Sequence, residues 1–535
     1  MMKTKLLLFI GIACTQLMLA QGWTHIQSLV PTDSSAEPQD MLGKAIARVD
    51  SHIFISAYAH SWDSMGQNRE FNAGAVYVFQ EDLAGSWEMT QKLTARERKG
   101  VGFYGWSVAA EGEWAAISTY TAHVDSQGET FRNSGLVEIF HLGSSGLWVY
   151  DTTLTAMPVK GFLSFGFSVS ISGNQLLVGA VDDPFDVNGQ DSVKQAGAAY
   201  LYEYVSGVGW QFIQKLVPSD RSEDADFGEY VQLAGDKAIV SAVRHSFPSP
   251  NFRTEAGKVF IFEKDSPSGM WVETAAFENR DNSSFTFYGD DISISGDYAM
   301  VGSKNVDVSP SVLKAGVVDV YRKNATTSVW EFHQTLQASD ASTQDEFGTA
   351  IDMNGGIAVI GATAEDHIGL DQDSVNGAGS AYVFELGPTG DWTEIAKINA
   401  PTRNRFDAFG DVVHLRGSSL MIGAPLADRD NQFFDAGMAH LFELDNSVEI
   451  EEPMSLPRFS ILQNPSSRLT IRWNGNSPKP YKLLLMNLMG QTVLETSYSQ
   501  EAIQEWPVEG VDPGLYIVQL EEQGGSLSHV TWKKI

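Results

Sequence analysis

One sequence pattern recurs seven times along this chain, at intervals of about 61 residues. Each copy opens with an aromatic or apolar residue followed by glycine, as in FGFSVSISGNQLLVGA. A fixed period of this length is typical of repeat architectures, in which each copy is one unit packed against its neighbours. We interpret the leading glycines as structural, because glycine permits a tight turn into a strand. They are Gly43, Gly105, Gly166, Gly228, Gly289, Gly348 and Gly410.

Every copy contains short segments in which apolar and polar residues alternate, a pattern that predicts β-strands. The first two segments are joined by a short polar turn, which predicts a β-hairpin. A third segment, such as AGAVYVFQ, follows a long polar loop, and a fourth opens on tryptophan, as in WQFIQKL. Four antiparallel strands per copy, without helical periodicity, predict an all-β chain that folds as a seven-bladed β-propeller.

The seventh copy lacks a tryptophan segment, because its pattern stops at LDNSVEIEEP. A spare copy of that segment stands near the start of the chain. Residues 22–33, GWTHIQSLVPTD, match residues 209–220, GWQFIQKLVPSD, which contain the fourth segment of the third copy. We therefore predict that the N-terminal strand completes the seventh blade and closes the ring, which would also remove exposed strand edges.

The pattern FG…VGA…AG.VYVFE…W..IQKL resembles the FG-GAP repeats of integrin alpha-subunit propellers and of many bacterial surface proteins. The resemblance covers residues 21–445 and implies the same seven-bladed fold. Integrin-type repeats that bind calcium carry an Asp-x-Asp-x-Asp-Gly loop between their first two strands. Here that position holds Ser172-Gly173-Asn174 or a similar turn. Because calcium takes six to eight oxygen ligands, we expect no integrin-type calcium site and no cofactor.

The start of the chain has the pattern of an export signal. Residues 1–20 combine the basic start MMKTK with an apolar stretch and a small residue at Ala20, as in a secretory signal peptide. Lipoprotein processing at Cys14 is the alternative, although Gly11, Ile12 and Ala13 make a poor lipobox. Cys14 is the single cysteine, so we expect no disulfide to stabilise the mature protein.

The end of the chain has a different pattern. After a predicted linker at residues 446–455, residues 456–535 contain short strands separated by glycine and proline turns, which predict a small β-sandwich. This tail resembles the C-terminal sorting domain of cargo for the type IX secretion system of Bacteroidota. The residues that carry the resemblance are Asn464, Pro465, Gly490, Gly514, Tyr516, Lys533 and Lys534. Family members more often have Tyr-Pro-Asn-Pro where this chain has Leu462-Gln463-Asn464-Pro465.

The resemblance of the tail implies the type IX machinery as a partner. It also implies secretion, or display on the outer-membrane surface of a Gram-negative bacterium. The alternative for the tail is an ordinary carbohydrate-binding or fibronectin-like β-domain. Whether the tail is removed and replaced by a surface anchor stays open.

The charge and the motifs of the chain exclude several function classes. A formal net charge of −31 disfavours nucleic acid and anionic membranes as partners but is compatible with cations, basic proteins and neutral glycans. Beyond the leader, no apolar run approaches the roughly 18 residues of a spanning helix. The chain has no HExxH, GxSxG, phosphate-loop or cysteine-nucleophile motif. We therefore expect a non-enzymatic adhesion or binding protein for a protein or glycan ligand. The alternatives are a polysaccharide lyase or hydrolase, and a scaffold module with no ligand beyond its own assembly.

The predicted topology places the loops between second and third strands (2–3 loops) and the connections between blades (4–1 connections) at one end of the propeller. Irregular loops on a rigid scaffold are where binding residues usually lie. Their aromatic residues are Tyr58, Trp62, Phe71, Phe131, Phe185, Phe247, Phe252, Phe433 and Phe434, and their arginines are Arg69, Arg132, Arg244 and Arg253. We predict ligand-binding roles for Tyr58, Trp62, Arg69, Arg132, Arg244, Arg253, Phe433 and Phe434. The alternative is that the aromatic residues brace their own loops.

The same loops hold residues that could bind a metal. The oxygen donors are Asp182, Asp183, Asp186, Asn188 and Asp191 in the third copy, Glu365, Asp366, Asp371 and Asp373 in the sixth, and Asp428, Asp430 and Asp435 in the seventh. Calcium could be held by Asp182, Asp183, Asp186, Asp191, Asp371 and Asp373. However, no run reproduces a complete calcium loop, and solvated carboxylates are the commoner explanation. Histidines at 60, 123, 245 and 367 lie in these loops as well.

Overall fold

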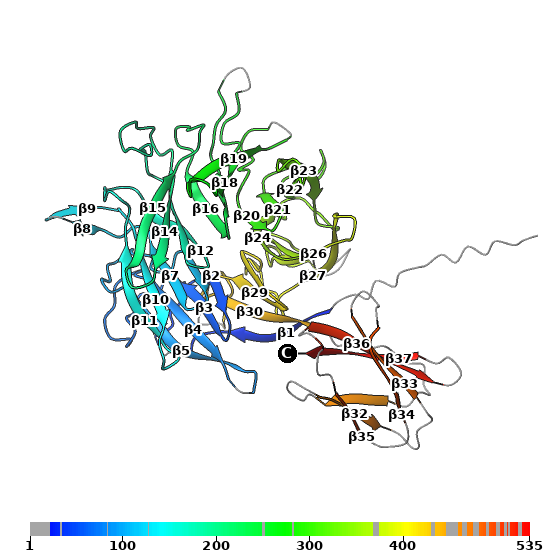
Figure 1. The fold of residues 1–535 in the computed structure, drawn as a ribbon. Helices are drawn as coiled ribbons and strands as arrows, with labels where there is room; N and C mark the ends of the chain where they lie inside the picture. Colours follow the sequence, from blue (N-terminus) through cyan, green and yellow to red (C-terminus); the bar gives the residue numbers. More distant parts are fainter. Residues whose placement is uncertain are drawn as a thin grey trace, which may run out of the picture. The chain divides into compact units, whose positions relative to one another are not determined.

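A computed structural model gives the fold of the chain (Figure 1). The residues that it describes are 22–32, 35–82, 84–126, 128–248, 252–280, 283–367, 374–429, 434–445, 458–462, 468–474, 481–487, 492–498, 503–507, 511, 514–522 and 527–534. Within these residues all regular secondary structure is β-strand. The chain divides into a compact unit at Trp23–Leu444 and a second unit that includes Asp445–Ile535. The predicted leader and the predicted linker at 446–455 lie outside the described residues.

The first unit is built from seven four-stranded antiparallel sheets, which are the blades of the predicted propeller. Blades 1 to 3 are β2 (Leu42–Val49), β3 (His52–Ala57), β4 (Ala75–Glu81) and β5 (Trp87–Leu93); β6 (Val108–Glu111), β7 (Trp114–Thr119), β10 (Leu136–Leu142) and β11 (Trp148–Leu154); and β12 (Phe165–Ser172), β13 (Gln175–Ala180), β14 (Ala198–Val205) and β15 (Gly209–Leu216). An additional hairpin, β8 (Val124–Ser126) with β9 (Glu129–Phe131), extends the 2–3 loop of blade 2. The repeat pattern did not predict this hairpin.

The remaining blades follow the same strand order. Blades 4 to 6 are β16 (Phe227–Ala234), β17 (Lys237–Ala242), β18 (Lys258–Lys264) and β19 (Trp271–Glu278); β20 (Ile292–Ser295), β21 (Tyr298–Ser303), β22 (Val317–Lys323) and β23 (Trp330–Leu336); and β24 (Phe347–Asn354), β25 (Ile357–Ala362), β26 (Ser380–Leu386) and β27 (Trp392–Ile398). Blade 7 contains β28 (Val412–Arg416), β29 (Ser419–Ala424), β30 (Met438–Asp445) and, at its edge, β1 (Gly22–Leu29).

The position of β1 confirms that the N-terminal strand closes the ring. It pairs with β30, and Figure 1 shows the blue β1 beside the yellow-orange β30. Trp23 packs on an apolar cluster formed by blades 6 and 7, and Leu29 is buried in the cluster between blades 7 and 1. The spare tryptophan segment therefore packs as the fourth strands of the other blades do, because it carries the same residues at the same spacing.

A glutamine in the fourth strand clamps one blade to the next. Gln27 Nε2 donates to the carbonyl oxygen of Trp87 at 2.9 Å, and the Trp87 amide donates to Gln27 Oε1 at 3.0 Å. The same pair of hydrogen bonds joins Gln91 to Trp148, Gln214 to Trp271 and Gln334 to Trp392. The shared glutamine of the IQSL and IQKL motifs is therefore an inter-blade contact, and in β1 it fastens blade 7 to blade 1.

The first strands of successive blades are also joined by side-chain hydrogen bonds. In each case a side chain accepts a bond from a backbone amide of the next blade. The pairs are Ser170 with Leu233, Gln232 with Ile294, Ser293 with Met353, Asp352 with Leu415, and His414 with Arg48. Ala47 and Ala109 occupy the equivalent positions in blades 1 and 2 and cannot accept such a bond.

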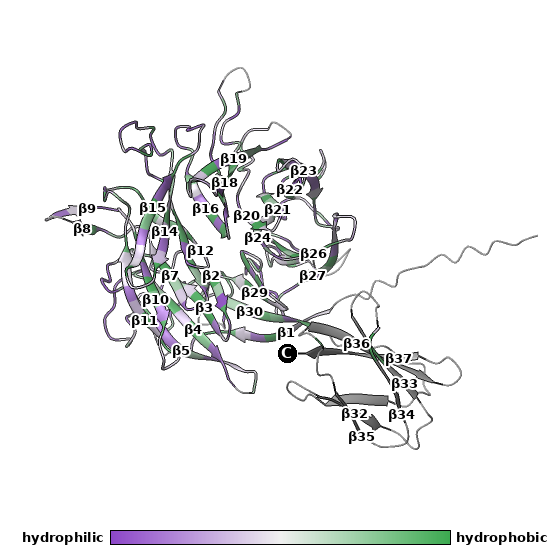
Figure 2. Cartoon of the chain, viewed as in Figure 1, coloured by the Kyte–Doolittle hydropathy of each residue, from purple (hydrophilic) through white to green (hydrophobic). Residues whose placement is uncertain are grey.

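Apolar packing between blades supplies the core. The second strands β3, β7, β13 and β29 are buried along their whole length, and Figure 2 shows hydrophobic residues (green) along many strands of the blades. The leading tryptophans of the fourth strands of blades 1 to 6 are between 2 and 7% exposed. Burial of large aromatic faces between neighbouring blades is a principal stabilising contribution to such a ring.

The seven leading glycines all have positive φ, between 84° and 98°, a region that side-chain-bearing residues avoid. At Gly228 a Cβ atom would also lie 2.6 Å from the carbonyl oxygen of Ala198. A second series of glycines precedes the third strands. At Gly135 a Cβ atom would lie 1.9 Å from the carbonyl oxygen of Phe165 in the next blade. Glycine is therefore required where adjacent blades touch through their backbones.

The second unit contains two antiparallel sheets. One has the order β31 (Arg458–Leu462), β32 (Arg468–Asn474) and β35 (Ile503–Pro507), and the other has β34 (Thr492–Tyr498), β33 (Tyr481–Asn487), β36 (Gly514–Glu522) and β37 (Leu527–Lys534). These strands agree with the short strands that the sequence predicts for residues 456–535. Gly514 and Tyr516 lie in β36, and Lys533 and Lys534 lie in β37. Asn464, Pro465 and Gly490 lie outside the described residues.

Candidate ligand-binding face

The 2–3 loops and 4–1 connections lie at the same end of the blades, because each blade is an antiparallel meander that starts at its first strand. We call this end the loop face. Several 2–3 loops are stiffened by isolated bridges, which pair Trp62 with Arg69, Phe185 with Ser192, Phe247 with Arg253 and His367 with Ser374. In blades 1 and 3 these loops are therefore small ordered hairpins, and some of their aromatic residues do brace them.

Three of the predicted ligand residues come together in blade 1. Trp62 Nε1 donates to Glu37 Oε1 at 2.8 Å, and Arg69 donates to Glu37 Oε2 at 3.3 Å. Burial would raise the pKa of Glu37, but these two hydrogen bonds outweigh it and lower the pKa. Tyr58 lies beside them and donates to Met41 Sδ at 2.7 Å. Sequence analysis missed Glu37, whose only signal is an acidic residue in the connection before the first blade.

A cavity of about 480 Å³ opens beside this group. Its walls include Glu37, Tyr58, Arg69, Phe71, Phe103, Trp106 and Tyr120. The Phe71 side chain is 59% exposed although it is fully apolar. We call this space the blade 1 pocket. It combines aromatic surface with a charged pair, which is the composition expected of a site for a small polar group.

The aromatic wall of the pocket continues towards the axis of the ring. Ring centroids are 5.2 Å apart for Tyr58 and Trp106, 4.9 Å for Trp106 and Tyr120, and 5.5 Å for Trp106 and Phe167. Trp106 and Phe167 directly follow leading glycines, so they stand where the first strand of a blade begins. The equivalent residues of the other blades are Lys44, Glu229, Asp290, Thr349 and Asp411.

Charged side chains occupy the other part of this inner ring. Lys44 Nζ lies 2.8 Å from Asp411 Oδ2. Burial, followed by repulsion from neighbouring carboxylates, raises the pKa of Glu229 to about 7, and burial raises that of Asp290 to about 6. The inner end of the loop face therefore has an aromatic side at blades 2 and 3 and an acidic side at blades 4, 5 and 7.

The other predicted ligand residues are dispersed. Arg244 is exposed and lies 3.5 Å from Asp226, while Arg132 and Phe434 are exposed elsewhere on the loop face. Phe433 lies outside the described residues. Arg253 differs from the prediction, because it is only 6% exposed, pairs with Glu278 at 2.9 Å and stacks on Phe247. Its guanidinium supports the loop from inside and is not presented to a ligand.

The structure does not assemble the predicted metal ligands of blade 3. Asp183 is fully buried and lies 2.8 Å from Lys215 Nζ, so a lysine already occupies the cation position. Asp182 accepts bonds from Ser164 and Gln195, and Asp186 accepts bonds from backbone amides of its own loop, which lower its pKa. Asp191 is exposed, and Asp371 and Asp373 lie outside the described residues. In the described part of the chain, no group of three or more His, Cys, Asp or Glu could hold a metal ion.

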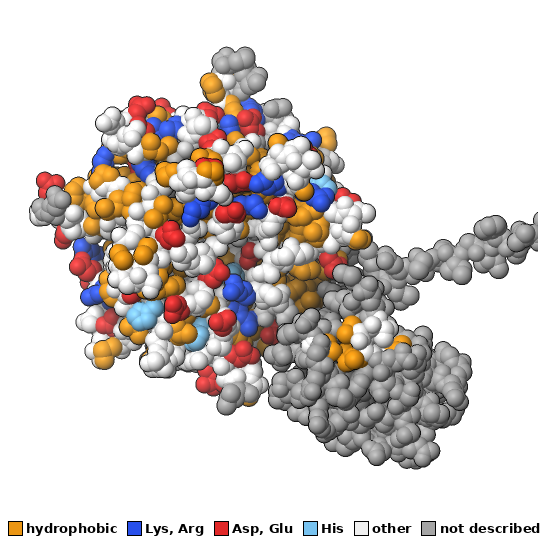
Figure 3. All heavy atoms as spheres, viewed as in Figure 1, with side chains coloured by type: hydrophobic (Ala, Val, Ile, Leu, Met, Phe, Trp, Pro, Cys, Tyr) orange, Lys and Arg blue, Asp and Glu red, His pale blue; other side chains and the backbone are white. Residues whose placement is uncertain are grey.

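Charged groups of both signs are mixed on the face of the propeller that Figure 3 shows. His60 and His245 are buried, and burial lowers the pKa of His245 to about 4. Among the described residues there is no helix with the length and apolar character needed to cross a membrane.

Comparison with known families matches both parts of the chain. Residues 148–202, 210–262, 330–384 and 392–442 match the FG-GAP repeat, and residues 463–534 match the secretion system C-terminal sorting domain. Each matched repeat runs from the tryptophan strand of one blade to the third strand of the next. No curated protein matches the chain in sequence.

Two solved structures that match the chain have very different sequences and low TM-scores. Sqt1 of Saccharomyces cerevisiae is 10% identical with a TM-score of 0.39, over 79% of this chain and 100% of that one. A Bacteroides uniformis protein described as "a putative 6-phosphogluconolactonase" is 9% identical with a TM-score of 0.41, over 70% of this chain and 90% of that one.

Proposed function

The chain is a seven-bladed propeller of FG-GAP repeats with a secretion system C-terminal sorting domain, and we propose that it is a secreted or cell-surface protein that binds a protein or glycan ligand through its loop face. The blade 1 pocket carries this proposal. Its exposed Phe71 and its aromatic wall are placed where a ligand would gain buried apolar area and stacking contacts. Single exposed aromatics are common, but here several line one cavity beside the Glu37–Arg69 pair.

The test is a glycan and matrix-protein array probed with the mature secreted protein. Phe71→Ala should weaken binding to the captured ligand at least tenfold. Phe332→Ala is the matched control, because Phe332 is a partly exposed aromatic residue on β23, in another blade, and does not line the blade 1 pocket. Equal losses in the two variants would contradict the assignment of the binding surface, as would binding that survives in Phe71→Ala.

Export by the type IX system is the second part of the proposal, and the match of residues 463–534 supports it. A chain that ends before residue 456 should stay inside the cell envelope, whereas the full chain should reach the medium or the outer surface. Mass spectrometry of the mature protein in both fractions would give its termini. Release of the truncated chain at the level of the full chain would contradict this route.

The acidic side of the inner ring favours one alternative, a polysaccharide-degrading enzyme. Glycoside cleavage uses carboxyl groups with separated pKa values, and Glu229 and Asp290 have raised ones. A screen on marine and plant polysaccharides would reveal turnover. Turnover that disappears in Glu229→Gln would establish the enzyme and displace the binding function as the main role.

A further inference from the structure

Three blades bury the same group of side chains beneath the loop face. In each, a lysine of the fourth strand contacts a residue at the start of the 2–3 loop and lies near the tyrosine ring of the third strand. Lys215 Nζ is 2.8 Å from Asp183 and 5.4 Å from the centre of the Tyr200 ring. The other two groups are His60, Tyr77 and Lys92 in blade 1, and Glu365, Tyr382 and Lys397 in blade 6. These blades therefore fill this position with their own ammonium group.

Blade 2 departs from the pattern at all three positions. Glu138 and Thr153 are directly opposite in β10 and β11, as Tyr200 and Lys215 are in blade 3. The residue that corresponds to Asp183 is Ala122. The tyrosine and lysine side chains are thus replaced by smaller ones, and the acidic group has moved from the loop to the third strand. Blade 2 keeps a carboxylate here but has lost the lysine.

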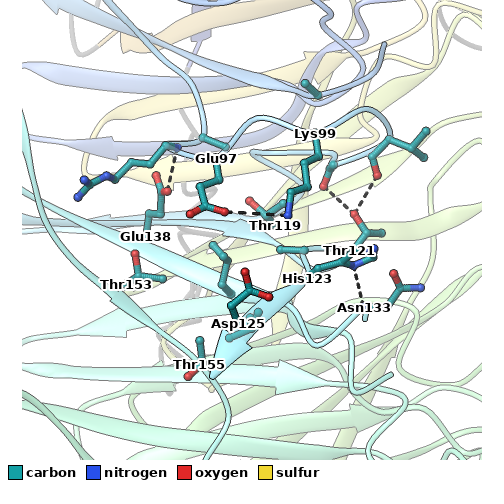
Figure 4. Close-up of a pocket in the computed structure, with 18 of the residues that line it drawn as sticks. Glu97, Lys99, Thr119, Thr121, His123, Asp125, Asn133, Glu138, Thr153 and Thr155 are labelled. Atoms are coloured by element: carbon teal, nitrogen blue, oxygen red, sulfur yellow. Dashed lines mark hydrogen bonds and ion pairs between the residues drawn. The ribbon is translucent and has the colours of Figure 1, made fainter. Parts of the chain in front are cut away.

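A cavity of about 830 Å³ occupies this part of blade 2, and its labelled lining residues are shown in Figure 4. One wall comes from the connection between blades 1 and 2, including Glu97 and Lys99, and another from β8 and the loop before it, including His123 and Asp125. Four threonine residues line it as well: Thr119, Thr121, Thr153 and Thr155. We call it the blade 2 cavity.

Glu138 is the buried acid of this cavity, since this residue is only 3% exposed. Its Oε1 accepts a hydrogen bond from the backbone amide of Arg96 at 3.1 Å. Its Oε2 makes no hydrogen bond of good geometry within the described residues, and neither does Thr119 Oγ1, although the buried Tyr104 hydroxyl lies close to the Glu138 carboxylate and lowers its pKa. Burial raises the pKa of Glu138 to about 7, against the opposing effect of the nearby Arg96. A ligand that donates to this buried carboxylate would satisfy an acceptor that is withdrawn from water.

We propose that the blade 2 cavity binds the side-chain ammonium of a lysine from a partner protein, received by Glu138. The assignment follows from the chain itself, since Asp183 and Glu365 receive the ammonium groups of its own lysines in equivalent blades. The net charge of −31 attracts basic partners towards the molecule. Arg96 does not fill the position, because its guanidinium stacks on Tyr150 at 4.1 Å. The inference rests on the proposed binding function of the loop face and specifies one chemical group that it recognises.

The probe is Nα-acetyl-lysine methylamide, titrated into the mature protein by calorimetry, with Nα-acetyl-norleucine methylamide as the uncharged comparison. The lysine compound should bind at least tenfold more tightly than the norleucine compound. Glu138→Gln should remove this preference. Thr153→Lys should abolish binding, because it restores the lysine that blades 1, 3 and 6 carry opposite the third strand.

Thr152→Lys is the control for Thr153→Lys. It adds the same charge one residue away, on the opposite face of β11, and Thr152 does not line the cavity. Both lysine variants should keep the wild-type melting temperature or exceed it, so lost binding in Thr153→Lys is not a loss of folding. Binding of the norleucine compound with equal affinity, or unchanged binding in Thr153→Lys, would overturn the proposal.

Glucosamine gives a further arm of the same experiment. If glucosamine binds and the lysine compound does not, the lysine assignment is wrong. The wider proposal can fail or hold separately from the lysine site. A ligand found on the array that binds wild type and Thr153→Lys equally would support binding by the loop face and reject the lysine site.

Discussion

Ring closure by β1 depends on a contact that a single substitution can remove. Gln27 both donates to and accepts from the backbone of Trp87, so its amide joins blade 7 to blade 1 through two hydrogen bonds. Gln27→Ala removes both. Gln27→Glu keeps the acceptor but cannot donate to the Trp87 carbonyl, and it places a carboxylate oxygen against that carbonyl. Both variants should therefore lower the free energy of unfolding of the propeller.

The magnitude follows from the two bonds. Each neutral hydrogen bond contributes roughly 0.5–1.5 kcal/mol net, so Gln27→Ala should cost about 1–3 kcal/mol. For a unit of about 420 residues the unfolding entropy is on the order of 0.9 kcal/mol/K, so the melting temperature should fall by only about 1–3 °C. Urea unfolding followed by tryptophan fluorescence is the better measurement, because Trp87 lies at this junction.

Gln91→Ala is the matched control, since Gln91 makes the same two bonds to Trp148 across the junction of blades 1 and 2. Equal losses at Gln27 and Gln91 are expected if β1 is a full member of the ring. A loss at Gln91 with none at Gln27 would refute closure by the N-terminal strand. No loss at either position would refute the energetic role of the clamp itself.

Three further predictions concern backbone contact, ionisation and buried charge. Gly135→Ala should lower the free energy of unfolding in urea by at least about 3 kcal/mol, because Gly135 combines a positive φ with a close backbone contact. Gly112→Ala should lower it by only about 1 kcal/mol, because no atom lies near the Cβ position there. Because the pKa of Glu229 is raised to about 7, the folded state holds a proton that the unfolded state releases, so the free energy of unfolding should fall between pH 4.5 and about 7. Glu229→Gln should make this slope shallower by at most about 1.4 kcal/mol per pH unit. Lys215→Met should cost about 3–5 kcal/mol by leaving Asp183 buried without its cation, and adding Asp183→Asn should recover part of that loss; equal stability of the single variant and wild type would contradict it.

The blades could be predicted from the sequence because every strand type has a local signature that is repeated in the chain. The leading glycine, the alternation of apolar and polar residues and the initial tryptophan are all recognised from residues adjacent in sequence. They can therefore be identified without three-dimensional information. The β8–β9 hairpin was missed because it occurs once and replaces a polar loop. Gly128 in its turn is the one local signal that pointed to it.

The candidate site was harder to predict because its contacts join distant segments. Asp183 was assigned as a possible metal ligand because its partner, Lys215, lies in another strand and is not visible in the local pattern. Trp106 and Phe167 were missed because each belongs to a different blade, and only the ring brings their side chains together. Alignment of the residue after each leading glycine would have revealed both. The blade 2 cavity requires the same comparison across copies at three positions at once.

The pairing of β1 with β30 also affects the order in which the chain can complete its fold. Ser28 and His440 bond to each other across 412 positions of sequence. β1 therefore cannot pair with β30 until the last blade has been made, so closure of the ring needs the whole propeller sequence. Contacts so distant in sequence form slowly. In a chain sent through a membrane before it folds, the delay would keep the first strand unpaired until the last blade has crossed.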